Sequence, residues 1–223
     1  MKKTFLPVLS LVICGFFTTL HAQVGIKGGI NLSTVVEEND EVSREDFDNK
    51  SIVGPVLGLT FDLGINDFFS IQPEIYYSQS GGKNTYRLLG SVTESVYRIN
   101  YIEVPILAKL KFGNAEQQGV GIYVAAGPFA GYALNGKREF KTEMDGNILF
   151  ENKEDFTFNN EDNARRLNYG ITGAAGVMFG RLSFDLRYNY GINNLLDKDA
   201  DNNNDNKPIL RTQGLALTLG YSF

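Results

Sequence analysis

The last ten residues of the chain, 214–223, constrain its fold more than any other stretch. Successive side chains of an extended strand point to opposite faces, so this segment has two faces of different chemistry. One face is apolar and carries Leu215, Leu217, Leu219, Tyr221 and Phe223. The other face is small or polar and carries Gly214, Ala216, Thr218, Gly220 and Ser222. The pattern predicts a strand that turns its apolar face to lipid and closes a transmembrane barrel, with an ordinary half-buried strand as the alternative.

Similar alternating segments of roughly ten residues recur along the chain, which is the pattern of a membrane β-barrel. The chain after residue 22 contains no long apolar run, which rules out a helical membrane protein. Gly and Ala are frequent in 120–134, so the faces of that strand cannot be assigned. We therefore predict an all-β fold, an eight-stranded antiparallel up-and-down transmembrane β-barrel, with strands in 24–33, 52–64, 69–78, 101–112, 120–134, 167–179, 182–190 and 214–223.

The links between these segments alternate in length, as periplasmic turns and extracellular loops do in outer-membrane barrels. The short links are 65–68, 113–119 and 180–181, and the long polar links are about 35–50, 80–98, 135–166 and 191–212. Pro73 and Pro105 each remove a ladder donor, so we expect a local bulge or a missing bond at each. Asp145 and Gly146 form a favoured two-residue turn, which predicts a hairpin of 139–144 with 147–150 inside the third long link.

Outward aromatic residues are sorted by strand end, which predicts two girdles at the membrane boundaries. Near the short links lie Phe61, Phe69, Phe112, Phe179, Phe184 and Phe223, and near the long links lie Tyr77, Tyr132, Tyr169 and Tyr190. A soluble lipocalin-like barrel also has eight strands, but its apolar face points inward around a ligand. The charges at mid-strand opposite the apolar face would be costly in such an apolar cup, which favours the membrane barrel.

The face opposite the apolar one carries four basic and four acidic side chains, namely Lys27, Lys109, Lys111, Arg187, Asp62, Glu74, Glu103 and Asp185. Side chains just fill an eight-stranded barrel, so we interpret this set as ion pairs that plug the lumen. A proton or ion path, or an active carboxylate pair, is the functional alternative. Glu74 and Lys109 lie on neighbouring strands at similar depth, which predicts a direct pair.

The first 22 residues have the layout of a secretory signal, with Lys2 and Lys3 before an apolar run and cleavage expected after Ala22. The barrel domain is then 23–223. A retained membrane helix is the alternative, although the apolar run is short for a span. A lipoprotein signal at Cys14 is rejected because Ile13 is not the small residue which that pattern requires.

Cleavage would remove the only cysteine, Cys14, and the only histidine, His21. Thiol chemistry, imidazole bases and His or Cys metal sites are then excluded from the mature chain. The formal net charge changes from −5 to −7, because two lysines and no acids are lost. An acidic protein of this kind is not expected to bind nucleic acid through its overall field.

Five short motifs follow one another over the mature chain, at residues 25–31, 71–78, 100–107, 126–128 and 187–191. In these motifs and their order, the chain resembles the PorT-like family of small outer-membrane β-barrel proteins of Bacteroidetes. The resemblance implies the barrel fold and outer-membrane location but no single activity, although the member that gives the family its name assists type IX secretion. The final strand also resembles the C-terminal strand of bacterial outer-membrane proteins, which implies recognition by the barrel-assembly machinery.

Two polar links are candidate cation sites. Asp197, Asp199, Asp201 and Asp205 stand at relative positions 1, 3, 5 and 9, as in a calcium loop. Asn202 replaces the turn glycine and Pro208 occupies the place of the bidentate glutamate, so a solvated loop is preferred for 197–205. The acidic segment 37–48 could attract divalent ions at lipid headgroups, and again a solvated loop is preferred. We assign no catalytic, cofactor-binding or metal-binding residue.

These observations predict a small non-enzymatic outer-membrane barrel with a structural or surface-interaction role exerted through its long loops. The expected partners are outer-membrane lipid, the barrel-assembly machinery and a protein at the extracellular loops, which the sequence does not identify. An accessory role in a secretion or assembly machine is the main alternative. A narrow porin is disfavoured because eight strands leave little lumen. A histidine-free carboxylate hydrolase is the enzymatic alternative.

Overall fold

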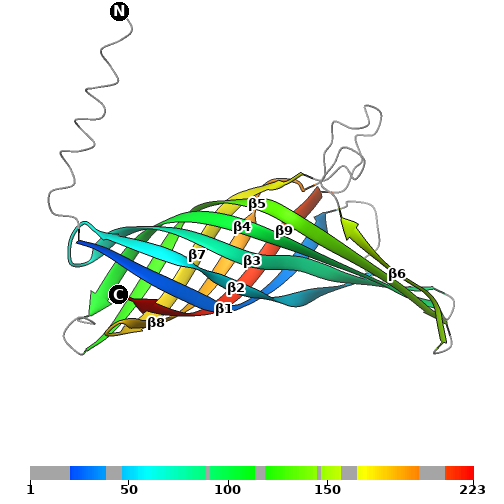
Figure 1. The fold of residues 1–223 in the computed structure, drawn as a ribbon, viewed down its shortest axis with the longest axis horizontal. Coiled ribbons are helices and arrows are strands. Elements are labelled where there is room, and N and C mark those ends of the chain that lie inside the picture. Colours follow the sequence, from blue (N-terminus) through cyan, green and yellow to red (C-terminus); the bar gives the residue numbers. More distant parts are fainter. Residues whose placement is uncertain are drawn as a thin grey trace, which may run out of the picture.

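A computed structural model describes residues 21–38, 47–88, 91–113, 119–144, 147–156, 165–195 and 209–223. The regular elements of this described part are all strands (Figure 1): β1 (His21–Glu38), β2 (Phe47–Gly64), β3 (Phe69–Leu88), β4 (Ser91–Gly113), β5 (Val120–Met144), β6 (Asn147–Phe156), β7 (Leu167–Phe179), β8 (Leu182–Gly191) and β9 (Ile209–Ser222). Over the same residues, no helix is long and apolar enough to cross a membrane.

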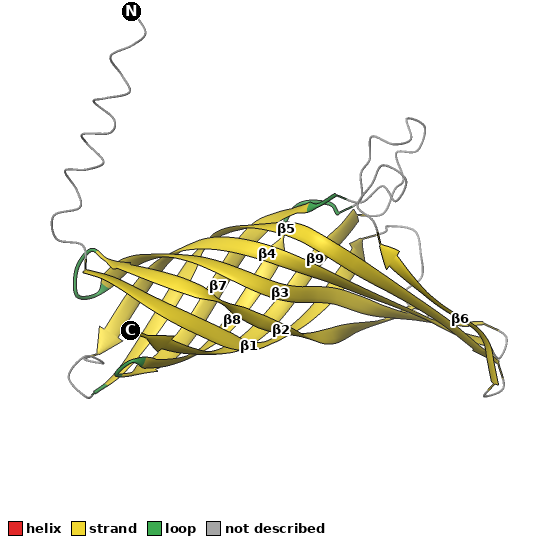
Figure 2. Ribbon diagram, in the orientation of Figure 1, coloured by secondary structure: helices red, strands yellow, loops and turns green. Residues whose placement is uncertain are grey.

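Eight of the strands close into an antiparallel ring, which confirms the predicted barrel (Figure 2). Each strand of the ring pairs with its neighbour in the chain, except that β5 pairs with β7. Pairing of β1 with β9 completes the circle. The remaining strand, β6, lies outside the ring and pairs with the part of β5 that runs beyond β7.

Side chains alternate between the two surfaces of the barrel wall as the sequence predicts. On β9, for example, Leu217 is 55% exposed whereas its neighbour Thr218 is 3% exposed. An apolar outer surface is stabilised by lipid, because lipid removes it from water. The predicted aromatic girdle residues are all on this outer surface, with Phe69 and Tyr190 half-buried. The predicted inward positions of the strands with assigned faces are also confirmed.

The faces of β5, which the sequence left unassigned, follow the same rule. Val120, Ile122 and Val124 point outward, while Tyr123 and Phe129 are buried inside the barrel. The small residues Gly121, Ala125 and Ala133 share the inner face with these two rings. Small side chains on both faces had hidden the alternation.

The short links at 65–68 and 180–181 form tight turns as predicted, while residues 114–118 of the third short link lie outside the described residues. In the bend at 65–68, the Asn66 side-chain oxygen accepts hydrogen bonds from the backbone N–H groups of Phe68 (3.1 Å) and Phe69 (2.7 Å). The turn after β7 contains Gly180 at φ +57°, a left-handed conformation that favours glycine. Gly113, the last residue of β4, has the same kind of conformation at φ +90°.

The two prolines interrupt the ladder without changing its register. On β3 and β4, Pro73 pairs with Ile106, and the pairing resumes in the same register at Tyr76 and Glu103. On β4 and β5, Pro105 pairs with Phe129, and the pairing resumes in the same register at Ala108 and Ala126. Of the two predicted outcomes, these sites therefore show a missing bond rather than a bulge.

Two of the predicted long links are mostly strand, so their assignment as loops is wrong. β3, β4 and β5 continue past the ring, and β5 and β6 form the predicted hairpin, in which Met144 pairs with Asn147. Asp145 and Gly146 themselves lie outside the described residues. We call residues 79–88, 91–100, 135–144 and 147–156 the extension. It begins at a register shift between Asn100 and Tyr101 and projects from the end of the barrel opposite the start of β1 and the C-terminus (Figure 1).

Candidate functional site

The eight predicted charges all point into the barrel. Six of them are buried, namely Lys27 on β1, Glu74 on β3, Glu103 and Lys109 on β4, and Asp185 and Arg187 on β8. Asp62 and Lys111 are half-buried. Strands from both sides of the closure between β1 and β9 therefore bring charges into one polar lumen.

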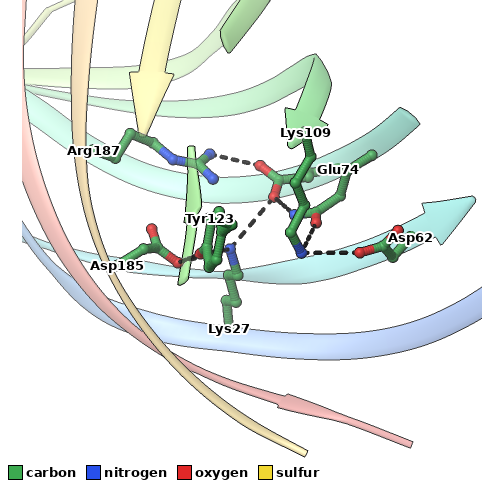
Figure 3. A network of polar contacts seen from close by, with 8 residues as sticks. Lys27, Asp62, Glu74, Lys109, Tyr123, Asp185 and Arg187 are labelled. Carbon is green, nitrogen blue, oxygen red and sulfur yellow. Dashed lines mark hydrogen bonds and ion pairs between the residues drawn. The ribbon is translucent and has the colours of Figure 1, made fainter. Parts of the chain in front are cut away.

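Two acids and two bases form the centre of this lumen (Figure 3). Lys27 Nζ lies 2.7 Å from Asp185 Oδ2 and 3.6 Å from Glu74 Oε1. Arg187 donates a hydrogen bond of 2.6 Å to the other Glu74 oxygen. Glu74 on β3 thus lies between two cations that come from strands on either side of β9. Buried ion pairs of this kind need each charge to be matched, because an unmatched charge in the interior is strongly destabilising.

A second group of polar side chains lies beside the first and contains Lys109, one member of the predicted pair. Lys109 Nζ lies 2.9 Å from Asp62 Oδ2 and donates a hydrogen bond of 2.8 Å to Gln72 Oε1. Gln72 in turn donates to Glu74. The predicted direct pair of Glu74 and Lys109 is therefore wrong, because Gln72 lies between them and Glu74 faces Lys27 and Arg187 instead.

Tyr123 joins the two groups and was missed by the sequence analysis. Its hydroxyl donates a hydrogen bond of 2.7 Å to Asp185 and accepts a longer one, 3.4 Å, from Lys27. Its ring centroid lies 4.4 Å from Lys109 Nζ, a distance at which a cation is attracted to the ring face. The outward residues Val120, Ile122 and Val124 were the signal that could have placed Tyr123 inside.

Glycines opposite the lumen tyrosines make room for their rings. Gly58 pairs with Tyr76, and a Cβ at Gly58 would lie 2.2 Å from the Tyr76 ring. Gly176 pairs with Tyr123, and a Cβ there would lie 2.6 Å from that ring. Backbone carbonyl oxygens lie equally close, Ile75 O at 2.2 Å from the first Cβ and Phe184 O at 2.6 Å from the second. All these distances are far below van der Waals contact, so the ring and the neighbouring backbone together leave no space for a side chain at either glycine.

The cavity beside Arg187 in the lumen is small. Tyr76, Ser78, Glu103 and Arg187 line a cavity of about 10 Å³, which holds one water molecule at most. Glu103 accepts a hydrogen bond of 2.6 Å from Ser78 at this place. The predicted ion pairs inside the lumen are confirmed for Lys27, Asp62, Glu74, Lys109, Asp185 and Arg187, whereas Glu103 is bound by Ser78 instead.

The extension has two faces of different chemistry. Ion pairs occupy the face that continues the outer surface of the barrel, with Lys83 and Glu94 at 2.6 Å and Arg98 and Glu139 at 3.1 Å. The face that continues the lumen is aromatic. There the Arg138 guanidinium lies 3.9 Å from the ring centroid of Phe140 and 4.9 Å from that of Tyr97.

The two candidate cation sites are not tested by the structure. The loop at 197–205 lies outside the described residues, and so does 39–46 of the acidic segment 37–48. Across the part of the chain that is described, no three acidic, histidine or cysteine side chains converge on a point that could hold a metal ion. The predicted signal at 1–22 is described only at its last two residues, where β1 begins.

The family described as "Outer membrane protein beta-barrel domain" matches residues 18–197. Solved structures with a similar course of the chain include the three that follow. Ail of Yersinia pestis, in complex with the heparin analogue sucrose octasulfate, is 16% identical over 91% of this chain and 99% of its own, with a TM-score of 0.42. OprG of Pseudomonas aeruginosa is 12% identical over 91% of this chain and 96% of its own, with a TM-score of 0.45. The outer membrane enzyme PagL is 13% identical over 86% of this chain and 98% of its own, with a TM-score of 0.37. No curated protein matches the chain.

Proposed function

The chain belongs to the outer membrane protein β-barrel domain family, and on this premise we propose that it acts through a surface interaction made by the extension. The protein is a small β-barrel of the outer membrane. The observation that carries the proposal is the length of its strands. β4 has 23 residues and β5 has 25, whereas a strand needs only about 9–11 residues to cross a bilayer.

The surplus length is organised rather than left as loose loops. The part of β4 in the extension pairs with β3 on one side and with β5 on the other, so its ladder is continuous up to Ser91. Ordering the backbone of each residue opposes folding by about 1–2 kcal/mol, and the membrane does not require this part of the chain. Ten residues of strand reach roughly 30 Å beyond the ring. An ordered sheet at that distance from the lipid is well placed to bind a partner.

The lumen supports the same proposal by offering little for transport or catalysis. Its central carboxylates, Glu74 and Asp185, are held by Lys27, Arg187 and Tyr123. A general acid or base needs a proton that can reach a substrate, and the cavity beside these groups admits no substrate. We therefore propose a non-enzymatic barrel that does not conduct solutes.

We also propose that the chain is a PorT-like barrel of Bacteroidetes, exported by a signal at 1–22 and folded by the barrel-assembly machinery through its last strand. Motifs 71–78 and 100–107, which lie on β3 and β4, support the family assignment. An accessory role in secretion rests on that resemblance. Mature protein that begins at Met1, or that is recovered from the periplasm in soluble form, would argue against export to the outer membrane.

A shortened barrel tests the proposed function. The variant lacks 82–97 and 138–154, with an Asn-Gly turn at each junction, so that the ring keeps its pairs. Crosslinking on intact cells, followed by purification of both proteins, should capture a partner with the full chain and not with the shortened one. The same partner on the shortened barrel would contradict the proposal. So would a steady conductance of porin size from the full chain in planar bilayers.

A further inference from the structure

We infer that the free edge of β6 binds an extended polypeptide segment as an additional strand, with basic side chains toward its acidic end and apolar side chains toward its apolar end. This inference rests on the surface-interaction role proposed above and specifies how the extension makes its contact. The residues that carry it are 147–155.

The first observation is the position of β6 in the sheet. β6 pairs with β5 over Gly136–Met144 and stands last in the strand order, and no strand of the described part of the chain pairs with its other edge. An edge strand points about half of its backbone N–H and C=O groups away from the sheet. β6 contains no proline, so each of its ten residues keeps a backbone donor.

The second observation is the character of this edge. Ile148, Leu149 and Phe150 are 55%, 61% and 56% exposed. Ile148 pairs with Glu143 and Phe150 with Thr142, so these two apolar side chains lie on opposite faces of the edge, and Leu149 is the extra residue of a register shift. Natural proteins protect free edges with short strands, charges, proline or β-bulges. The run 148–150 carries no charge and no proline, and the register shift at Leu149 is its one protective feature, so its apolar side chains stay open to a partner.

The third observation is the charge at the other end of the strand. Glu151, Glu154 and Asp155 outnumber Lys153, which lies 3.3 Å from Glu151. The facing strand shows which chemistry complements these acids, because β5 sets Lys141 opposite Glu151, Arg138 opposite Glu154 and Lys137 opposite Asp155. A strand on the free edge would meet the same side chains at the same positions. It should therefore carry basic residues there, as β5 does.

A second copy of this chain does not meet these requirements. Antiparallel pairing of the two edges over 148–155 would set Ile148 opposite Asp155 and Leu149 opposite Glu154. Parallel pairing in register would set each acid opposite itself, and like charges directly opposite are destabilising. The occupant is accordingly a different polypeptide with basic and apolar parts.

The probe is the peptide GKRTFKVVM, which is the sequence of β5 over 136–144 with threonine in place of Glu139 and valine in place of Thr142 and Glu143. A second peptide has the same residues in reverse order and tests the parallel direction. Binding is measured with the full-length barrel in nanodiscs of zwitterionic lipid, by fluorescence anisotropy and by hydrogen exchange. One of the two peptides should bind and should slow exchange at alternate amides of β6. A control peptide with glutamate in place of every lysine and arginine should bind at least about tenfold more weakly.

Two further controls separate strand addition from simple charge attraction. N-methylation of the bound peptide at one set of alternate amides should abolish binding, whereas methylation of the other set should not, because only one set faces β6. The protein variant D155K should weaken binding by a similar factor to the control peptide. The matched variant D67K makes the same charge change at the exposed turn between β2 and β3 and should leave binding unchanged.

The inference is overturned if neither peptide binds, if both methylated sets behave alike, or if β6 is already protected in a dimer of the barrel. These results differ from a failure of the proposed function. If the shortened barrel still captures the partner, the function is wrong. If the extension is required for capture but β6 gains no protection with either peptide, only the edge-pairing mode is wrong.

Discussion

The lumen and the extension both contain ion pairs between basic and acidic side chains, but the lumen pairs are buried and the extension pairs are exposed to water. In the lumen, Arg187 and Glu74 lie 2.6 Å apart and both side chains are buried. In the extension, Lys83 and Glu94 also lie 2.6 Å apart, but about a third of each side chain is exposed. The equal distances do not imply equal contributions, because water competes with the exposed pair and not with the buried one. The lumen therefore fixes the barrel, whereas the extension remains available for a partner.

The largest effect should come from breaking the central lumen pair. Arg187→Met leaves Glu74 with Lys27 alone and should lower the free energy of unfolding by about 3–5 kcal/mol, measured by urea unfolding in lipid vesicles. The double variant Glu74→Gln/Arg187→Met should lose less, because no carboxylate is left without its partner. Equal losses in the two variants would mean that the lumen pair behaves like the exposed ones.

A smaller effect is expected when the neutral member of the lumen network is changed. Tyr123→Phe keeps the ring between Lys27 and Lys109 but removes the hydroxyl that donates to Asp185. Loss of one hydrogen bond to a buried carboxylate should reduce stability by about 1–3 kcal/mol in the same assay. Tyr188→Phe is the matched control, since Tyr188 lies on the exposed outer face. The idea fails if both variants are equally stable.

In the extension, the exposed pair of Arg98 and Glu139 tests whether competition from water makes such an ion pair contribute little to stability. A double-mutant cycle of Arg98→Ala and Glu139→Ala should give a coupling energy of about 0.2–1 kcal/mol, and added salt should reduce it. Hydrogen exchange of the β4 and β5 amides near the pair provides the measurement. A coupling as large as that of the lumen pair would remove the distinction between the two regions.

The smallest effect is a local response to alkaline pH. The hydrogen bond that Lys141 donates to Glu143 raises the pKa of Lys141 above its ordinary value. A raised pKa means that the protonated side chain stabilises the folded hairpin at neutral pH, and that this contribution disappears as the pH rises through that pKa. Exchange of the amides near Met144 should therefore speed up in that range, beyond the intrinsic increase, and Lys141→Gln should abolish the transition. An identical pH profile in the variant would contradict this.

The sequence predicted the barrel wall well because lipid imposes a strict rule on it. Every outward side chain of the ring must suit hydrocarbon, so the alternation of Leu215, Leu217 and Leu219 has one interpretation. The same rule put the eight charges inside. In the extension no face must suit hydrocarbon, and residues 91–100 are half-buried on both faces, so charged and polar side chains are allowed on either face. The sequence of its strands therefore predicts polar loops, apart from the hairpin that Asp145 and Gly146 indicate.

The partners within the lumen were harder to predict than its members. The alternation of side chains along β3 shows that Glu74 points inward. Whether Glu74 pairs with Lys109 or with Arg187 depends on how closure of the ring places β8 relative to β3. That arrangement depends on the whole ring and not on any local pattern. Tyr123 was missed for a local reason, because Gly and Ala around it occupy both faces of β5.

The fit of each lumen tyrosine against a glycine of the neighbouring strand has a consequence for how related sequences can diverge. A side chain at Gly58 would meet the Tyr76 ring and also the backbone carbonyl oxygen of Ile75, both at 2.2 Å. One at Gly176 would meet the Tyr123 ring and the carbonyl oxygen of Phe184, both at 2.6 Å. A smaller residue in place of either tyrosine relieves only the first of these contacts. Among homologues the two tyrosines can therefore become smaller, whereas the two glycines should stay glycine even where the tyrosine has been lost.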